Sequence, residues 1–355
     1  MSSIQVPILP ITNIRPHSNP EVERLEVATV AGWQLCVNKG KYQVGDRVVY
    51  FEQGTTIPRE LADALGVTNY LSEKVNINGE RELVIHRIKL KGEPSFGLAI
   101  DVPDVMQDFP DNTNVAEFFG ASKHYPPVRA TVGDAECDHP LFPRYTDIEN
   151  MRSYPAVLSD GEEVIATEKI HGTNVRIGII QEQGEYVRMA GSRTLRRKQP
   201  ETDFRHNIYW FPFSIDAVDS AIAALALGGA RQVVLYGEVF GPKVQSYDYG
   251  TKGLSFRAFD LMIDGVFIDA ALFVQWCEAN AIDYAPILYK GPFSINAIQN
   301  VSNGVSIVGG SHGREGVVVR PWTERDDPAI GRVILKYVGD DYLFGKSAKN
   351  DTTDV

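Results

Sequence analysis

The sequence predicts a two-domain protein in which an all-β barrel precedes a mixed α+β domain. The chain has 355 residues, which exceeds one average domain, and 43% of them are hydrophobic, enough for two cores. Short strand patterns separated by turn residues fill the first 120 residues. After residue 160, strand patterns alternate with two helical ones.

The segment 1–120 contains short strand patterns and one modest helical pattern, at 60–65. Turn-forming residues such as Gly32, Gly45 and Gly92 separate the candidate strands, which span 27–30, 33–37, 48–51, 83–90 and 96–100. Strands of this spacing are typical of a small closed barrel, and the OB-fold is the commonest such barrel that handles nucleic acid. We therefore predict an OB-fold over 1–120.

A proline-rich segment, 121–160, follows the barrel and includes Tyr125-Pro126-Pro127. It predicts an ordered connector. The α+β domain should span 161–346, with helices at 215–227, before Gly228-Gly229, and at 269–282. The polar tail 347–355 is expected to be flexible.

Composition excludes several classes of protein. No stretch has the length of a membrane span or the pattern of a secretory signal, and the three cysteines lie too far apart to suggest a zinc site or a disulfide framework. We therefore expect a cytoplasmic protein that binds no membrane and, since no interface pattern is visible, a monomer. The net charge of −11 argues against coating of nucleic acid by bulk electrostatics, although a basic segment lies at 193–198.

The strongest chemical signal surrounds Lys169, which follows an apolar strand at 164–167 and is flanked by Glu168, His171, Gly172 and Asn174. Taken alone, such a motif more often indicates a surface turn with a solvated lysine. Four more segments place charged residues beside apolar strands, at 236–241, 256–260, 314–320 and 333–338. Buried charges are costly unless they are paired or serve a ligand. Their repetition therefore indicates one shared polar site.

These segments, in this order, resemble the covalent nucleotidyltransferases and most closely the ATP-dependent RNA ligases. The motifs are Lys-x-His-Gly-Thr-Asn, Ser-Arg, Gly-Glu-x-Phe-Gly, Phe-x-x-Phe-Asp and Glu-Gly-Val-Val, between residues 143 and 346. DNA ligases and capping enzymes usually carry Asp at the position of His171 and a trailing OB domain, for which nine residues after Lys346 leave no room. Segments 14–19 and 25–28 resemble the opening of tRNA-binding OB domains. The resemblance implies an OB-fold barrel followed by an α+β nucleotidyltransferase (adenylyltransferase) domain.

The resemblance also implies a reaction. A lysine attacks the α-phosphate of ATP to form lysyl-AMP, AMP passes to an RNA 5′-phosphate, and an RNA 3′-OH displaces AMP, in RNA repair and with Mg²⁺ or Mn²⁺. The substrate would be RNA 3′-OH and 5′-phosphate ends. The sequence does not decide whether these ends lie in a nicked duplex. By motif position the catalytic residues are Lys169, Glu238, Glu315 and Lys336, and the ATP- or AMP-binding residues are Glu168, His171, Asn174, Arg193, Phe256 and Val318.

Within this set, Lys169 is the nucleophile, and Glu238 and Glu315 hold the metal through water. Glu168 reads the purine edge, while Phe256 and Val318 stack on the base; Phe259 is expected in the core. The family usually has a second lysine beside the one matched by Lys336. This chain has Ile334 or Val338 there, and Lys346 or Arg332 is the expected substitute.

The barrel is expected to bind RNA through phosphate contacts and one stacked aromatic. The cationic candidates are Lys39, Lys41, Arg47, Arg87, Lys89 and Lys91, and the aromatic ones are Trp33, Tyr42, Tyr50 and Phe51. His17 is interpreted as structural. Two alternatives remain open: a DNA ligase or capping-type nucleotidyltransferase, and a catalytically retired RNA-binding protein.

Overall fold

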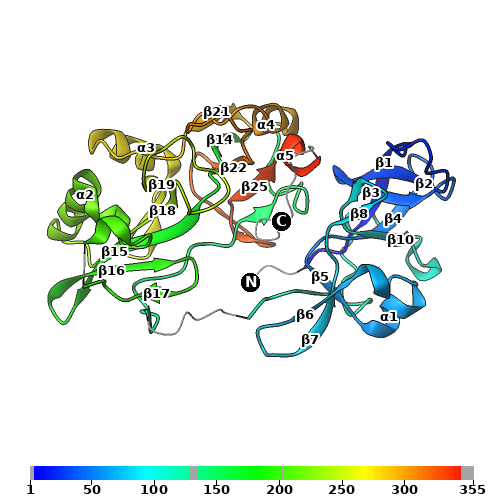
Figure 1. Cartoon of the computed structure of the whole chain (residues 1–355), viewed down its shortest axis with the longest axis horizontal. Helices are drawn as coiled ribbons and strands as arrows, with labels where there is room; N and C mark the ends of the chain where they lie inside the picture. Colours follow the sequence, from blue (N-terminus) through cyan, green and yellow to red (C-terminus); the bar gives the residue numbers. More distant parts are fainter. Residues whose placement is uncertain (1–3, 128–133, 202, 345–355) are drawn as a thin grey trace. The chain divides into compact units, whose positions relative to one another are not determined.

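The computed structural model describes residues 4–127, 134–201 and 203–344. The chain divides into two compact units, which are coloured blue to cyan and green to red in Figure 1. Among the described residues, the first contains 4–127 and the short segment 152–155, and the second contains 134–151, 156–201 and 203–344. Lys346 and the predicted tail at 347–355 lie outside the described residues.

The first unit is built from two antiparallel sheets. The five-stranded sheet has the order β10-β4-β1-β2-β3 and the four-stranded sheet the order β11-β5-β7-β6. A β-bulge at 11–13 lets β1 pair with β4 through its first residues and with β2 through the rest, so the sheet curls. The strands are β1 (Ile8–Pro16), β2 (Leu25–Val30), β3 (Trp33–Asn38), β4 (Arg47–Phe51), β5 (Thr55–Ile57), β6 (Ser72–Val75), β7 (Arg81–Val84), β10 (Leu98–Asp101) and β11 (Ser122–Lys123).

Most predicted elements of this unit are present, including helix α1 (Arg59–Ala64). Two predicted strands differ. The segment 83–90 forms β7 and then β8 (Ile88–Leu90), which pairs separately with β9 (Glu93–Ser95). The strand predicted from residue 96 begins at Leu98, because Gly97 has a φ of +82°, and a Cβ on it would lie 2.5 Å from the Phe51 carbonyl oxygen.

The barrel aromatics are core residues. Trp33, Tyr42, Tyr50 and Phe51 are each at most 8% exposed. The Tyr42 hydroxyl donates to Asp101 (2.7 Å), and the Arg152 guanidinium lies 5.0 Å from the Trp33 ring. The expectation that one of these four reaches RNA is therefore wrong, because the large side chains of so small a barrel are needed to fill its interior.

A buried polar network ties the β8–β9 hairpin to β1. His17 accepts from the Asn19 amide (3.0 Å) and contacts the Leu90 carbonyl (3.0 Å), so its structural interpretation is confirmed. Glu93 accepts from Arg15 (2.6 Å) and from the Ser18 amide (3.1 Å). Burial opposes ionisation of Glu93, but these hydrogen bonds outweigh it and lower its pKa to about 2.

This network predicts a pH-dependent hairpin. Because the folded pKa of Glu93 lies below the ordinary value of 4.5, its stabilising effect is complete above pH 4.5 and is lost as pH falls toward 2. The protection of the backbone amides of residues 88–95 against hydrogen exchange, relative to their intrinsic rates at each pH, should therefore fall from pH 5 to pH 3. The Glu93→Gln variant should lack most of this fall; an identical fall in the variant would contradict the assignment.

The second unit contains two larger sheets. The seven-stranded sheet has the order β12-β17-β16-β15-β18-β19-β20 and the five-stranded sheet the order β13-β25-β22-β14-β21. A small two-stranded sheet joins β23 (Asp326–Asp327) and β24 (Gly331–Arg332). The other strands are β12 (Ala135–Glu136), β13 (Glu149–Asn150), β14 (Glu163–Glu168), β15 (Thr173–Glu182), β16 (Glu185–Ser192), β17 (Arg196–Arg197), β18 (Gln232–Phe240), β19 (Ser255–Ile263), β20 (Val266–Phe267), β21 (Ile287–Pro292), β22 (Gly316–Pro321) and β25 (Leu335–Val338).

Both predicted helices of this unit are confirmed. Helices α2 (Asp216–Leu227) and α3 (Ala270–Ala279) cover one face of the seven-stranded sheet (Figure 1) and share with it a core that includes Val175 and Val233. Residues of the opposite face, such as Tyr236, pack with Phe142 and Ile334 in another core. Helices α4 (Ile295–Ser302) and α5 (Asp340–Phe344) were not predicted, since both are short. No helix among the described residues is long and apolar enough to cross a membrane.

Candidate active site

Lys169 lies in the turn between β14 and β15. Its backbone amide donates to the Gly316 carbonyl (3.0 Å), which joins the turn to the start of β22. Its ammonium forms an ion pair with Glu315, whose side chain is fully buried, while the Lys169 side chain is 15% exposed. His171 Nδ1 lies 3.5 Å from the other Glu315 oxygen. The structure thus brings two predicted site residues, Lys169 and His171, together around the buried carboxylate of a third, Glu315.

An aromatic wall surrounds His171. Its Nε2 lies 3.0 Å from the Ser246 hydroxyl, and its backbone amide donates to the Tyr249 hydroxyl (2.6 Å). Burial raises the pKa of Tyr249 well above its ordinary value, and the charge of Glu315 adds to this rise, so the phenol stays neutral. The Tyr247 ring packs edge-on against His171 and stacks on His312 with ring centroids 4.0 Å apart.

Two glycines allow the close backbone approach that forms this site. A Cβ on Gly172 would lie 2.9 Å from Glu238 Cγ and still closer to the Val239 carbonyl oxygen. Gly316 has a φ of +159°, and a Cβ there would lie 2.8 Å from Val338 Cα. Gly172 therefore packs the lysine turn directly on β18, which places Glu238 beside the turn.

This packing predicts a strong effect of one methyl group. The Gly172→Ala variant should be destabilised by about 1–3 kcal/mol through overpacking, and the displaced turn should lose alignment of Lys169. Urea denaturation measures the first effect. Gly184→Ala in the β15–β16 turn is a useful comparison, because its Cβ would meet no atom within 4 Å, although its φ of +90° carries a backbone cost. A Gly172 variant as stable as wild type would contradict the packing argument.

Asn174 and Glu238 form a register pair on β15 and β18. The side-chain oxygen of Asn174 is buried and has no hydrogen-bond partner among the described residues. Unsatisfied buried acceptors are rare in native proteins. This oxygen is therefore a candidate ligand contact next to Glu238.

Val318 and Lys336 lie in the neighbouring sheet. The register pairs Thr167 with Val318, and Val318 with Lys336, across β14, β22 and β25. Cross-strand partners project from the same face of a sheet. Lys169 follows Thr167 by two residues. The row of Thr167, Val318 and Lys336 therefore extends from the lysine turn across three strands of the sheet.

The Glu168 side chain is hydrogen-bonded to the loop that contains Ser306 and Ile307. Its carboxylate accepts from the Ser306 hydroxyl and from the Ile307 amide (2.9 Å), and it is almost fully buried. It therefore fixes the segment 306–308. Its role at the purine edge stays a prediction.

Phe256 does not join the Lys169 cluster in this structure. It packs in the helix-covered core with Val175 and Val239. Phe259 contacts instead the Tyr145 ring (4.9 Å between centroids) and the apolar cluster of Ile170 and Tyr249. Phe259 is three residues after Phe256, so ordinary strand alternation turns it to the opposite, site-facing side of β19. The register shift next to it pairs Asp260 with Tyr236 and so brings Asp260 to that same side.

Two other predicted contacts are engaged elsewhere. Arg193 lies at the surface after β16 and forms an ion pair with Asp147. Arg332, an expected substitute for the second lysine, binds Asp260 (2.7 Å) and Glu324 (2.6 Å). Its guanidinium is therefore part of a structural network, and that substitution is wrong. Ile334 is buried in the core.

The network around Asp260 was not predicted. Asp260 is fully buried on β19, and its oxygens accept from Arg320 (2.9 Å), Arg332 (2.7 Å) and the Tyr145 hydroxyl (2.7 Å). Glu324 binds both guanidinium groups. Burial alone would raise the pKa of Asp260, but the two arginines lower it below its usual value. Two acids and two arginines therefore form a balanced cluster that links β19 with β22.

Family comparisons agree with this architecture. Residues 162–338 match the family model for RNA ligase, and residues 6–102 match a model for an OB-fold domain. No curated protein sequence matches the chain significantly.

Solved structures of an RNA ligase from Naegleria gruberi resemble the whole chain. The complex with pyrophosphate has a TM-score of 0.68 and 19% identity, and the match covers 98% of this chain and 99% of that one. A lysine-to-methionine mutant with AMP and manganese has a TM-score of 0.69 and 20% identity, covering 96% and 98%. At this identity the likeness establishes the fold. The predicted OB-fold followed by an α+β ligase domain is therefore confirmed.

Proposed function

The chain carries a domain of the RNA ligase family behind an OB-fold domain, and from this premise we propose that it is an ATP-dependent RNA ligase that joins RNA 3′-OH and 5′-phosphate ends in RNA repair. The observation that carries the proposal is the ion pair between Lys169 and the fully buried Glu315. The Lys169 side chain is mostly buried, its acidic partner is Glu315, and its turn requires glycine at position 172. This arrangement has no evident structural purpose. It suits a nucleophile held ready for attack.

In the proposed first step, Lys169 Nζ attacks the α-phosphorus of ATP. The ammonium first gives up one proton to become the free amine, an N–P bond forms as the P–O bond to pyrophosphate breaks, and a second proton leaves to solvent or to the Glu315 carboxylate beside it, so that one N–H remains in lysyl-AMP. AMP then passes to the RNA 5′-phosphate, which frees Lys169, and the RNA 3′-OH displaces AMP.

The residues fit a hydrated divalent ion. No group of three or more His, Cys, Asp or Glu in the described ranges could hold a metal ion by itself. Glu315 and Glu238 offer two carboxylates near Lys169, which suits Mg²⁺ or Mn²⁺, since these ions keep several waters and bind phosphate oxygens. Such an ion would neutralise phosphate charge and favour the free amine of Lys169. The Naegleria ligase was solved with ATP and manganese, which supports this choice.

The nucleotide would bind across the same surface. The unsatisfied oxygen of Asn174 suits a ribose hydroxyl, and Lys336 suits a phosphate. We transfer the stacking role from Phe256 to Phe259, because Phe259 lies on the site-facing side, with Val318 as the aliphatic partner. Arg193 would reach phosphate only after releasing Asp147.

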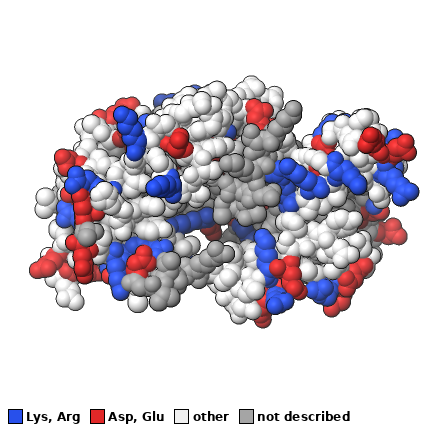
Figure 2. Space-filling model, in the orientation of Figure 1, with Lys and Arg blue, Asp and Glu red and all other residues white. Residues whose placement is uncertain are grey.

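The OB-fold domain would hold the RNA strand near the break. Figure 2 shows Lys and Arg side chains over the part of this unit that contains β1, β2 and β3. Among the predicted cations, Lys41 and Arg47 are paired with Asp101 and Asp111. Exposed Lys39, Lys89 and Lys91 are the better candidates for phosphate contact.

A labelling experiment tests the proposal. Purified protein is stripped of bound AMP and incubated with α-labelled ATP or GTP and Mg²⁺ or Mn²⁺, and the denatured protein is examined for an acid-stable label. ATP labelling with sealing of RNA 3′-OH ends is the expected result. Labelling by GTP would indicate a capping-type enzyme, and a preference for DNA 3′-OH ends would indicate a DNA ligase. No label would favour a retired RNA-binding protein.

A further inference from the structure

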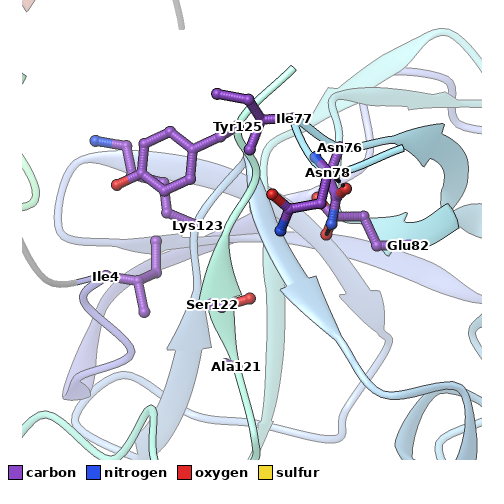
Figure 3. A pocket seen from close by; sticks show the side chains of 9 residues that line it. All are labelled: Ile4, Asn76, Ile77, Asn78, Glu82, Ala121, Ser122, Lys123 and Tyr125. Carbon is purple, nitrogen blue, oxygen red and sulfur yellow. Dashed lines mark hydrogen bonds between the residues drawn. The ribbon is translucent and has the colours of Figure 1, made fainter. Parts of the chain in front are cut away.

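A pocket lies in the first unit, on the four-stranded sheet, whereas the Lys169 site belongs to the second unit. It has a volume of about 380 Å³ and opens to solvent between the β6–β7 turn and the segment that follows the OB barrel. Figure 3 shows Tyr125 and Lys123 on one side, Asn76, Asn78 and Glu82 on the other, and Ile77 at the top of the view. Both walls belong to the same unit.

The polar wall is rigidly built. The Asn76 side-chain oxygen accepts from the backbone amides of Asn78 (2.9 Å) and Glu80 (3.0 Å), which fixes the turn. Its amide group donates to Glu82 (3.2 Å). The other Glu82 oxygen contacts His124 Nδ1. Glu82 is thus held from both sides, yet each carboxylate oxygen can accept a second hydrogen bond.

The remaining wall supplies apolar and aromatic surface. Ile77 is 56% exposed, although isoleucine is among the residues most often buried. It lies at the pocket together with the Tyr125 ring. An aliphatic side chain and an aromatic ring at a pocket lined by amide and carboxylate groups are the components that recognise a flat, polar-edged ring.

We infer that this pocket receives one unpaired nucleobase of the RNA strand, an inference that rests on the proposed ligase function. Tyr125 would stack on the base, while Glu82 and Asn78 would bind its polar edge. A carboxylate accepts from an exocyclic amino group, so cytosine suits Glu82 better than uracil, whose O4 would face the carboxylate. Lys123 is the cation of the pocket and suits a flanking phosphate.

The charge of the pocket favours a base within a strand over a free nucleotide. The lining residues include one lysine and one carboxylate, which leaves no excess positive charge for a triphosphate. A strand does not need that charge locally, because its other phosphates bind elsewhere on the domain. A paired base cannot enter, since its edge is occupied.

Binding of labelled 12-residue oligo(C) and oligo(U) RNA to the full chain, followed by fluorescence anisotropy, tests the inference. The two oligomers carry equal charge, so a difference reports on the base. Wild type should prefer oligo(C). Tyr125→Ala should weaken oligo(C) binding by about tenfold through loss of one stacked base, and Tyr125→Phe should restore it. Asn78→Ala and Glu82→Gln should reduce the preference for oligo(C).

Tyr70→Ala is the matched control, because Tyr70 is an exposed tyrosine of the same unit outside the pocket. Unchanged oligo(C) binding by Tyr125→Ala, or an equal loss in Tyr70→Ala, would overturn the inference. The inference would also be overturned if Tyr125→Ala weakened binding of a fluorescent cytidine monophosphate as much as it weakens binding of oligo(C), because the pocket would then be assigned to free nucleotides. Labelling of the protein by ATP in the absence of RNA is measured in parallel. If wild type takes up no AMP label, the ligase function is overturned. If wild type is labelled but Tyr125→Ala binds oligo(C) as wild type does, only the pocket inference is overturned.

Discussion

Replacing Lys169 by alanine is expected to abolish formation of the acid-stable AMP label, by on the order of 10³-fold or more, as for deletion of other catalytic nucleophiles. The site is built around the Lys169–Glu315 ion pair in a turn fixed by Gly172 and Gly316, so the attacking amine is lost with this side chain. The measurement is the amount of label per protein after incubation with α-labelled ATP and Mn²⁺.

The same variant should retain the final step. RNA that already carries AMP on its 5′-phosphate no longer needs the lysine as a nucleophile, so Lys169→Ala should still seal it to a 3′-OH end. This result would separate loss of the nucleophile from misfolding. Lys290→Ala is the control, because Lys290 is an exposed lysine of the same unit that lies over the Trp322 ring. Full labelling of Lys169→Ala would contradict the assignment.

The sequence predicts the regular elements where their periodicity is unbroken. Helices α2 and α3 follow apolar residues at helical spacing, and both were found. Strand β1 was missed because Pro10 and Pro16 lie in it, and proline normally argues against a strand. The bulge within β1 allows it to bend between two partners, which no local pattern reveals.

The site was predictable where its residues are neighbours in sequence. Lys169 and His171 share one motif, and Glu315 begins another. Ser246 and Tyr249 were missed because they lie in a loop more than 70 residues away, with no periodic signal beyond the sequence Tyr-Asp-Tyr. Phe256 was assigned to the base and Phe259 to the core by motif position. The structure places Phe256 in the helix-covered core and Phe259 beside Ile170 and Tyr249, and motif position alone does not reveal which face of β19 is turned to the site.

Removing the Asp260 carboxylate is expected to destabilise the second unit by about 3–5 kcal/mol, the range for breaking a buried ion pair. In Asp260→Ala, Arg320 and Arg332 would remain buried with only Glu324 to balance them. Urea denaturation measures the loss. Asp219→Ala removes an acid from the surface pair with Arg188, whose side chain is 46% exposed, and should cost about 1 kcal/mol or less.

The pH dependence distinguishes the ionic network from simple packing. The folded pKa of Asp260 lies below its ordinary value of 3.8, so its contribution is complete above that pH and is lost as pH falls through the folded pKa. The stability difference between wild type and Asp260→Ala should therefore be constant from pH 5 to pH 7 and shrink below pH 3.8. A difference that persists unchanged at lower pH would assign the loss to the cavity left by the side chain, because a cavity cost does not depend on protonation.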